Sequence, residues 1–184
     1  MLNGKVARHL LFWSLATAGA AADLVTKHLV FTRLGEGAPP LEVLGQLLLI
    51  RTARNTGTFF GLGSGGPGSN TALTVFTVLM MALVLYMYLL PPREAAGRTL
   101  LYTLALGLVF AGAGANLYDR VYFHYVRDFI DLGIHEHRWP TFNLADAWLT
   151  AGIAVYILAL MRMGRKPAAA APPAGGAPGG DASG

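Results

Sequence analysis

Four long apolar segments constrain the fold of this chain more than any other feature of its sequence. They cover residues 9–31, 71–90, 99–118 and 144–161 of 184, and the second and third contain no charged residue. A helix needs about 20 apolar residues to cross a bilayer core of about 30 Å. With 54% hydrophobic and 13% charged residues, the chain is too apolar for an ordinary soluble domain. We therefore expect a mainly α-helical membrane protein with four transmembrane helices.

The two ends of the chain set the expected domain organisation. The first segment is too long for the apolar part of a signal peptide and is interrupted by Asp23 and Lys27, so a cleaved leader is the weaker interpretation. Residues 167–184 consist almost entirely of Ala, Pro and Gly, cannot form a core, and are predicted to be disordered. We expect one membrane domain over residues 1–166, followed by this tail.

The distribution of basic residues indicates the orientation in the membrane. Four crossings place both termini on one side, and seven Lys and Arg residues would lie on each side. On the side of the termini they sit in short segments next to the spans (Lys5, Arg8, Arg93, Arg98, Arg162, Arg165 and Lys166). Short segments dominate the positive-inside rule, which favours cytoplasmic termini and outer connections at 32–70 and 119–143. The net charge of +4 fits contact with anionic lipid, and without a basic stripe it does not indicate nucleic-acid binding.

The outer connection at 32–70 contains chemistry as well as structure. Short strand-like runs between residues 41 and 63 end in a glycine-rich turn, so we expect a small β-sheet on the membrane surface. The RNTGTFFG motif at 54–61 has two interpretations. It is either a surface turn with aromatic anchors, or a site where Asn55 hydrogen-bonds a substrate backbone and Gly57 permits close approach.

Polar residues also occur within the apolar segments, where an unpaired charge is costly. Asp23 and Lys27 are four residues apart and share a helix face, so they form either a local ion pair or the anchor of a polar site between helices. The small residues of GAGANLYDR favour close helix packing. Packing does not account for Asn116, Asp119 and Arg120 in the same motif. The last two form either an exposed interfacial pair or part of a polar site.

Asp146 lies at the start of the fourth apolar segment, three residues after Asn143. One interpretation is a capping box with Asn143 as the N-cap, which the helix dipole also favours. The other is a catalytic carboxylate that shares one proton with a second carboxylate, so that one acts as general base on water and the other as general acid. Asp119, Asp128 and Asp131 are candidates for the second carboxylate, and spacing does not choose among them.

Other catalytic chemistries find little support in the sequence. His135 and His137 flank Glu136, but they lack the i, i+4 spacing of a zinc-protease helix. Cysteine is absent, and no G-x-S-x-G or S-x-x-K nucleophile motif occurs. We therefore expect no metal and no other cofactor.

Four motifs in this order resemble the lipoprotein signal peptidases, the bacterial type II signal peptidase family. They are DLVTK at 23–27, NTGTFFG at 55–61, GAGANLYDR with VRDF at 112–129, and FNLAD at 142–146, and the resemblance covers residues 9–163. It implies an intramembrane aspartyl endopeptidase that removes the signal peptide of a diacylglyceryl-modified prolipoprotein, cutting before the lipidated cysteine. It implies that Asp128 and Asp146 are the catalytic pair. The residues implied to orient this pair or bind substrate are Asp23, Lys27, Asn55, Gly57, Asn116, Asp119, Arg120 and Asn143.

Four positions depart from the usual pattern of that family. Arg127 stands in place of Val, Ala115 in place of Gly, and Thr58 with Phe59 in place of an Ala pair. A cation next to Asp128 lowers the pKa of that carboxyl unless the cation points to water.

The resemblance also implies surroundings for the enzyme. It indicates the bacterial inner membrane, an active site near the outer face, lipid-modified prolipoproteins as substrates, and contact with membrane lipid; we expect a monomer. The alternative is a proton-coupled carrier or channel subunit, because ionisable residues in membrane segments often have that role. Against it, the polar residues gather near the outer ends of the segments and form no relay across the second and third. A purely structural subunit leaves this gathering unexplained.

Overall fold

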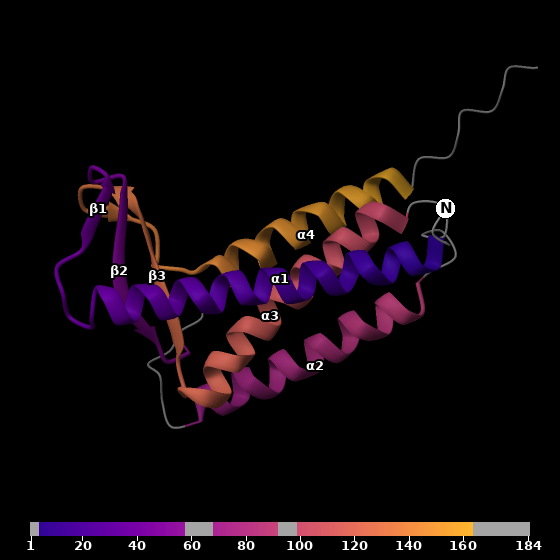
Figure 1. Ribbon diagram of the computed structural model, residues 1–184, viewed down its shortest axis with the longest axis horizontal. Helices are drawn as coiled ribbons and strands as arrows, with labels where there is room; N and C mark the ends of the chain where they lie inside the picture. The colour runs from indigo at the N-terminus through magenta and orange to yellow at the C-terminus, as the bar shows by residue number, and fades with distance from the viewer. Residues whose placement is uncertain (1–3, 58–67, 92–98, 164–184) are drawn as a thin grey trace, which may run out of the picture.

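The computed structural model describes residues 4–57, 68–91 and 99–163, in a bundle of helices with a small sheet at one end (Figure 1). The helices are α1 (Gly4–Arg33), α2 (Ser69–Leu89), α3 (Thr99–Tyr122) and α4 (Leu144–Met163). The strands are β1 (Leu41–Leu44), β2 (Leu48–Asn55), β3 (Val126–Ile134) and β4 (His137–Arg138). The prediction of a mainly helical chain with a small β-sheet is confirmed, and the sheet is antiparallel. The predicted tail at 167–184 lies outside the described residues.

Among the described residues, three helices are long and apolar enough to cross a membrane by length and composition: α2, most of α3 (Leu100–Tyr122) and most of α4 (Leu144–Arg162). Helix α1 is the longest, with 30 residues, and lies alongside the other three (Figure 1). It is less uniformly apolar because it contains Asp23, Lys27 and many small residues. The fourth crossing, by α1, therefore stays a prediction.

Helix α3 is the centre of the bundle, because α1, α2 and α4 all pack against it. Where α3 meets α4, no side chain separates the backbones. A Cβ atom added to Gly112 would collide with the carbonyl oxygen of Ala145, and one added to Gly152 of α4 would lie 2.9 Å from the carbonyl oxygen of Ala105. In lipid, small residues of this kind let helices approach closely and gain packing energy without a hydrophobic driving force.

We expect Gly112→Ala to lower the stability of the detergent-solubilised protein by about 1–3 kcal/mol, because overpacking forces the two backbones apart. Gly114→Ala is the matched control on the same helix, since among the described residues its added Cβ would meet only Met81 Cε, at 3.6 Å. Thermal unfolding of the two variants measures the difference. If Gly112→Ala unfolds at the same temperature as Gly114→Ala, the close approach of α3 and α4 is not required.

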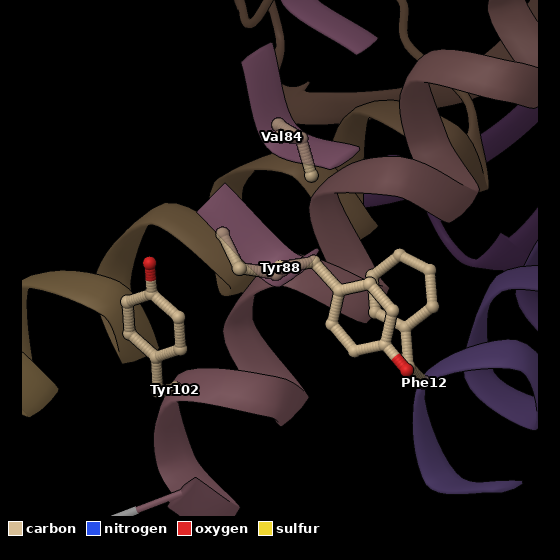
Figure 2. Packing of buried hydrophobic residues seen from close by; sticks show 5 residues of the cluster. Phe12, Val84, Tyr88 and Tyr102 are labelled. Carbon is tan, nitrogen blue, oxygen red and sulfur yellow. The ribbon is translucent and has the colours of Figure 1, made fainter. Parts of the chain in front are cut away.

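An aromatic cluster holds α1, α2 and α3 together at the end opposite the sheet. Its buried members are Phe12, Val84, Tyr88, Tyr102 and Leu106. Figure 2 shows the ring of Tyr88 stacked on that of Phe12, with the ring centroids 3.9 Å apart. The Tyr88 hydroxyl hydrogen-bonds His9 Nδ1, so its polar tip has a partner. This end of the bundle is closed by packing of these side chains.

The sheet has the strand order β1-β2-β3-β4, with all neighbours antiparallel. In the β2–β3 pair, Ala53 lies opposite Asp128 and Arg54 opposite Arg127, and the register shifts between Ile50 and Ala53. On the other side of β3, the N–H groups of Phe129 and Ile130 both donate to the carbonyl of Phe142. Close to Asp128, the pairing of β3 is therefore irregular both with β2 and with the segment that contains Phe142. Such bulges re-aim side chains and are common beside active sites.

Candidate active site

Asp128 on β3 and Asp146 in the first turn of α4 are held together by Asn143, which binds both. The side-chain Nδ2 of Asn143 donates to Asp128 Oδ1 at 2.6 Å, and its backbone N–H donates to Asp146 Oδ2 at 3.2 Å. Asn143 is fully buried and Asp128 is nearly so. Two carboxylates from different elements therefore meet at the end of the bundle that carries the sheet.

The capping-box interpretation of Asp146 is also correct. The Asp146 backbone N–H donates to Asn143 Oδ1 at 2.9 Å, which reciprocates the bond from the Asn143 N–H to the Asp146 carboxylate. The second oxygen of Asp146, Oδ1, accepts from Asn116 Nδ2 at 2.9 Å. The helix cap uses Oδ2 of Asp146 and thereby fixes the direction of Oδ1, so the capping role leaves one carboxylate oxygen available to the site.

Asp128 is oriented from the opposite side by Asn55. Asn55 Nδ2 donates to Asp128 Oδ2 at 3.1 Å, while Asn55 Oδ1 accepts from the Gly57 N–H at 3.1 Å. Gly57 has a φ of 115°, a backbone conformation that residues with a side chain rarely adopt. A Cβ atom added there would lie 3.0 Å from Leu73 Cδ1. Gly57 thus fixes the amide orientation of Asn55. The remainder of that motif, residues 58–61, lies outside the described residues.

A buried ion cluster supports the pair from behind. Lys27 Nζ lies 2.6 Å from Asp23 Oδ2 and 3.2 Å from Asp119 Oδ2, and it donates to Asn116 Oδ1 at 2.9 Å. Asp23 Oδ1 accepts from the Ala145 N–H at 2.9 Å, which satisfies a further donor at the start of α4. Asp23 and Lys27 therefore form both a local ion pair and an anchor between helices. Because Lys27 holds Asn116 Oδ1, the Asn116 amide must present its nitrogen to the Asp146 carboxylate.

The interpretation of Asp119 and Arg120 as an exposed pair is wrong. Helix α3 continues to Tyr122, beyond the expected end at residue 118, so both residues are helical. Asp119 is fully buried and binds Lys27 and Arg127. Arg120 is half-buried, and among the described residues its guanidinium makes only a 3.5 Å contact with the Asn116 carbonyl. Its charge lies within electrostatic range of both Asp128 and Asp146.

Two positions were open for the Arg127 side chain: pointing to water or lying against Asp128. The structure shows neither. The Arg127 side chain is buried, and Nη2 lies 2.7 Å from Asp119 Oδ1. A strand alternates its side chains between two faces, so Arg127 and Asp128 point in opposite directions. Asp119 compensates the charge of Arg127, which explains how a cation can lie next to Asp128.

Geometry chooses among the three candidate partners of Asp146. Asp119 is held by two cations behind the pair. Asp131, farther along β3, forms ion pairs with Arg138 at 2.7 Å and Arg51 at 3.4 Å. Asp128 alone of the three shares Asn143 with Asp146 and has no basic side chain bonded to it among the described residues.

The environment favours a proton on Asp128. Burial, with a smaller effect from the negative charge of Asp146, raises the pKa of Asp128 to about 7. Hydrogen bonds from Asn55 and Asn143 and the charge of Lys27 act in the opposite direction but are weaker. At neutral pH the pair can hold one proton, which general acid–base catalysis needs.

His135 and His137 lie at the turn between β3 and β4, and His135 has a positive φ of 51°. Within the part of the chain that the structure describes, no group of three or more His, Asp or Glu side chains is placed to hold a metal ion. The expectation that no metal or other cofactor is used stays a prediction.

Comparisons with known proteins agree on one family. A family model described as signal peptidase (SPase) II matches residues 15–162. A lipoprotein signal peptidase of Sulfurihydrogenibium sp. (strain YO3AOP1) is 33% identical over 159 residues, which cover 85% of this chain and 92% of the relative. One from Staphylococcus aureus (strain MRSA252) is 34% identical over 140 residues, or 76% and 81% of the two chains. A solved bacterial membrane enzyme aligns with a TM-score of 0.70 and 32% identity, covering 82% of this chain and 87% of the other.

Proposed function

The chain belongs to the signal peptidase II family and removes signal peptides from prolipoproteins, and we propose that Asp128 and Asp146 carry out this hydrolysis. The observation that carries the proposal is the position of Asn143, which binds both carboxylates at once. Two carboxylates so placed, one of them with a raised pKa, form the acid–base pair of an aspartyl protease.

The pair supplies both proton transfers of peptide hydrolysis. Asp146 takes a proton from water as the water oxygen attacks the scissile carbonyl carbon, and Asp128 gives its proton to the carbonyl oxygen. When the C–N bond breaks, Asp146 passes its proton to the leaving nitrogen and Asp128 recovers a proton from the hydroxyl group. Both carboxyls return to their starting states. Asn55, Asn116 and Asn143 hold the two groups in place and need not move during the reaction.

The surroundings of the pair support a position near a membrane surface. Asp128 belongs to β3 and Asp146 to the first turn of α4. The sheet lies at one end of the bundle, and the helices extend away from it (Figure 1). We infer four crossings, cytoplasmic termini, and a site at the outer face of the bacterial inner membrane. The substrate then presents the bond before its lipidated cysteine at that depth. We also propose that the enzyme acts as a monomer.

The raised pKa of Asp128 predicts how the rate depends on pH. Below about pH 7 Asp128 keeps its proton, and above that pH the proton is lost, so kcat/KM falls by about tenfold per pH unit. Initial rates on a lipid-modified precursor in detergent, from about pH 5 to about pH 9, measure this alkaline fall in kcat/KM. Circular dichroism at each pH provides the control for unfolding. A rate that stays constant through the alkaline range in folded protein is incompatible with Asp128 as the proton holder.

A further inference from the structure

The buried pair of Arg127 and Asp119 lies behind the catalytic carboxylates and has no part in the proton transfers. Asp119 Oδ1 accepts from Arg127 Nη2 at 2.7 Å and from Nε at 3.2 Å. Asp119 Oδ2 accepts from the Arg127 backbone N–H at 3.0 Å. One carboxylate thus holds both the side chain and the main chain of one residue. Taking two charges out of water is expensive, so a buried pair of this kind is weak evidence for stability alone.

The contacts of Arg127 fix the peptide that directly precedes Asp128. Its guanidinium carbon lies 4.3 Å from the ring centroid of Phe123, at the end of α3. Its carbonyl oxygen lies 3.5 Å from Asn143 Nδ2, in the cap of α4. Residue 127 therefore ties the end of α3 and the cap of α4 to the first residues of β3. These contacts fix the backbone position of Asp128, although the Arg127 side chain contacts neither catalytic carboxylate.

The same pair also affects Asp146 through Lys27. The buried charges of Asp23, Lys27, Asp119 and Arg127 sum to zero, because two are acidic and two are basic. Without Arg127, Lys27 would be the one cation bonded to Asp119 among the described residues. Lys27 would then be drawn toward Asp119 and away from Asn116 Oδ1, which it now holds at 2.9 Å. Asn116 orients Asp146, so loss of the Lys27–Asn116 hydrogen bond would also disturb the orientation of the Asp146 carboxylate.

We propose that Arg127 is a positioning residue for the cleavage reaction: by holding Asp119 it fixes the peptide before Asp128 and leaves Lys27 to orient Asn116 toward Asp146. This inference rests on the proposed function of the two carboxylates. Because the substrate does not contact Arg127 in this arrangement, the effect falls on kcat and not on KM. A bidentate, planar group is required, which lysine cannot replace.

The test compares Arg127→Met and Arg127→Lys with the wild type, using a lipid-modified precursor and equal amounts of folded, monodisperse protein. We expect kcat to fall on the order of 10- to 100-fold in both variants, with KM within about twofold, because small misplacements of reacting groups cost that much. Arg54→Met is the matched control. Arg54 lies opposite Arg127 in the sheet, pairs with Glu36 and covers the Tyr125 ring, but its side chain is 54% exposed. This variant is expected to keep its kcat within about twofold.

A double variant separates positioning from stability. Asp119→Asn with Arg127→Met removes the unpaired buried charge, so its unfolding temperature should recover toward the wild type while kcat stays low. Recovery of both stability and kcat would reduce Arg127 to a structural role, and an unchanged kcat in Arg127→Met would refute the proposal outright. These outcomes differ from failure of the proposed function. In that case the wild type does not cleave, or Asp128→Asn still does.

Discussion

Asp128→Asn and Asp146→Asn are each expected to lower cleavage of a lipid-modified precursor by about 10³-fold or more, because an amide cannot shuttle a proton. The change keeps the size of the side chain, so the fold should survive. Local hydrogen bonding changes in a defined way. Asn143 and Asn55 both donate to Asp128, so an amide placed there turns its NH₂ toward one donor. Initial rates with purified variants measure the loss.

Asp131→Asn is the matched control for these variants. Asp131 lies on the same strand as Asp128 and is equally buried, but its carboxylate binds Arg138 and Arg51. We expect Asp131→Asn to lose stability and to keep its rate within about fivefold, because it leaves the acid–base pair intact. Substantial turnover by folded Asp128→Asn or Asp146→Asn would remove that residue from the mechanism.

The same precursor without its lipid is expected to be cleaved at least about 100-fold more slowly, because the lipid anchor positions the scissile bond. Two acyl chains anchor the cysteine at the membrane surface, and each buried CH₂ contributes about 0.8 kcal/mol. Anchoring confines the peptide to a plane and fixes its depth next to Asp128 and Asp146. A soluble aspartyl protease obtains this positioning from a long cleft. The described residues of this chain supply only four helices and four short strands.

The comparison needs one precursor with and without prior diacylglyceryl transfer, the same enzyme, and the mass of the released signal peptide as readout. Both forms are used at concentrations where they partition fully into micelles, so that partitioning does not limit the rate. Equal rates would mean that the enzyme does not recognise the lipid and acts as a general signal-peptide hydrolase.

Features encoded by local spacing could be predicted from the sequence. The apolar runs predicted the helices, and the three-residue spacing of Asn143 and Asp146 predicted the capping box that the structure contains. The four-residue spacing of Asp23 and Lys27 predicted their ion pair. In the capping box and in the ion pair, the two partners lie within about one turn of helix, so the distance between them follows from helix geometry alone.

Features that depend on distant partners could not be predicted. Strand β3 lies within residues 119–143, for which the sequence predicts only an outer connection, and its sequence, VRDFIDLGI, includes three charged residues, all of which are buried. Arg127 is neutralised by Asp119, eight residues earlier on another element, and Asp131 partly by Arg51, 80 residues away. Spacing therefore left Asp119, Asp128 and Asp131 equivalent. The family resemblance pointed to Asp128, and the tertiary structure places it beside Asp146.

The most direct test of the central claim uses the purified full-length chain in detergent with a diacylglyceryl-modified precursor, followed by the masses of both products. We predict a signal peptide that ends at the residue before the cysteine, and a remainder that begins with the lipidated cysteine. Both should form with the wild type and be absent with Asp128→Asn. The absence of any shortened product from folded wild-type protein, together with proton flux after reconstitution in liposomes, would contradict this function and identify a proton-coupled carrier.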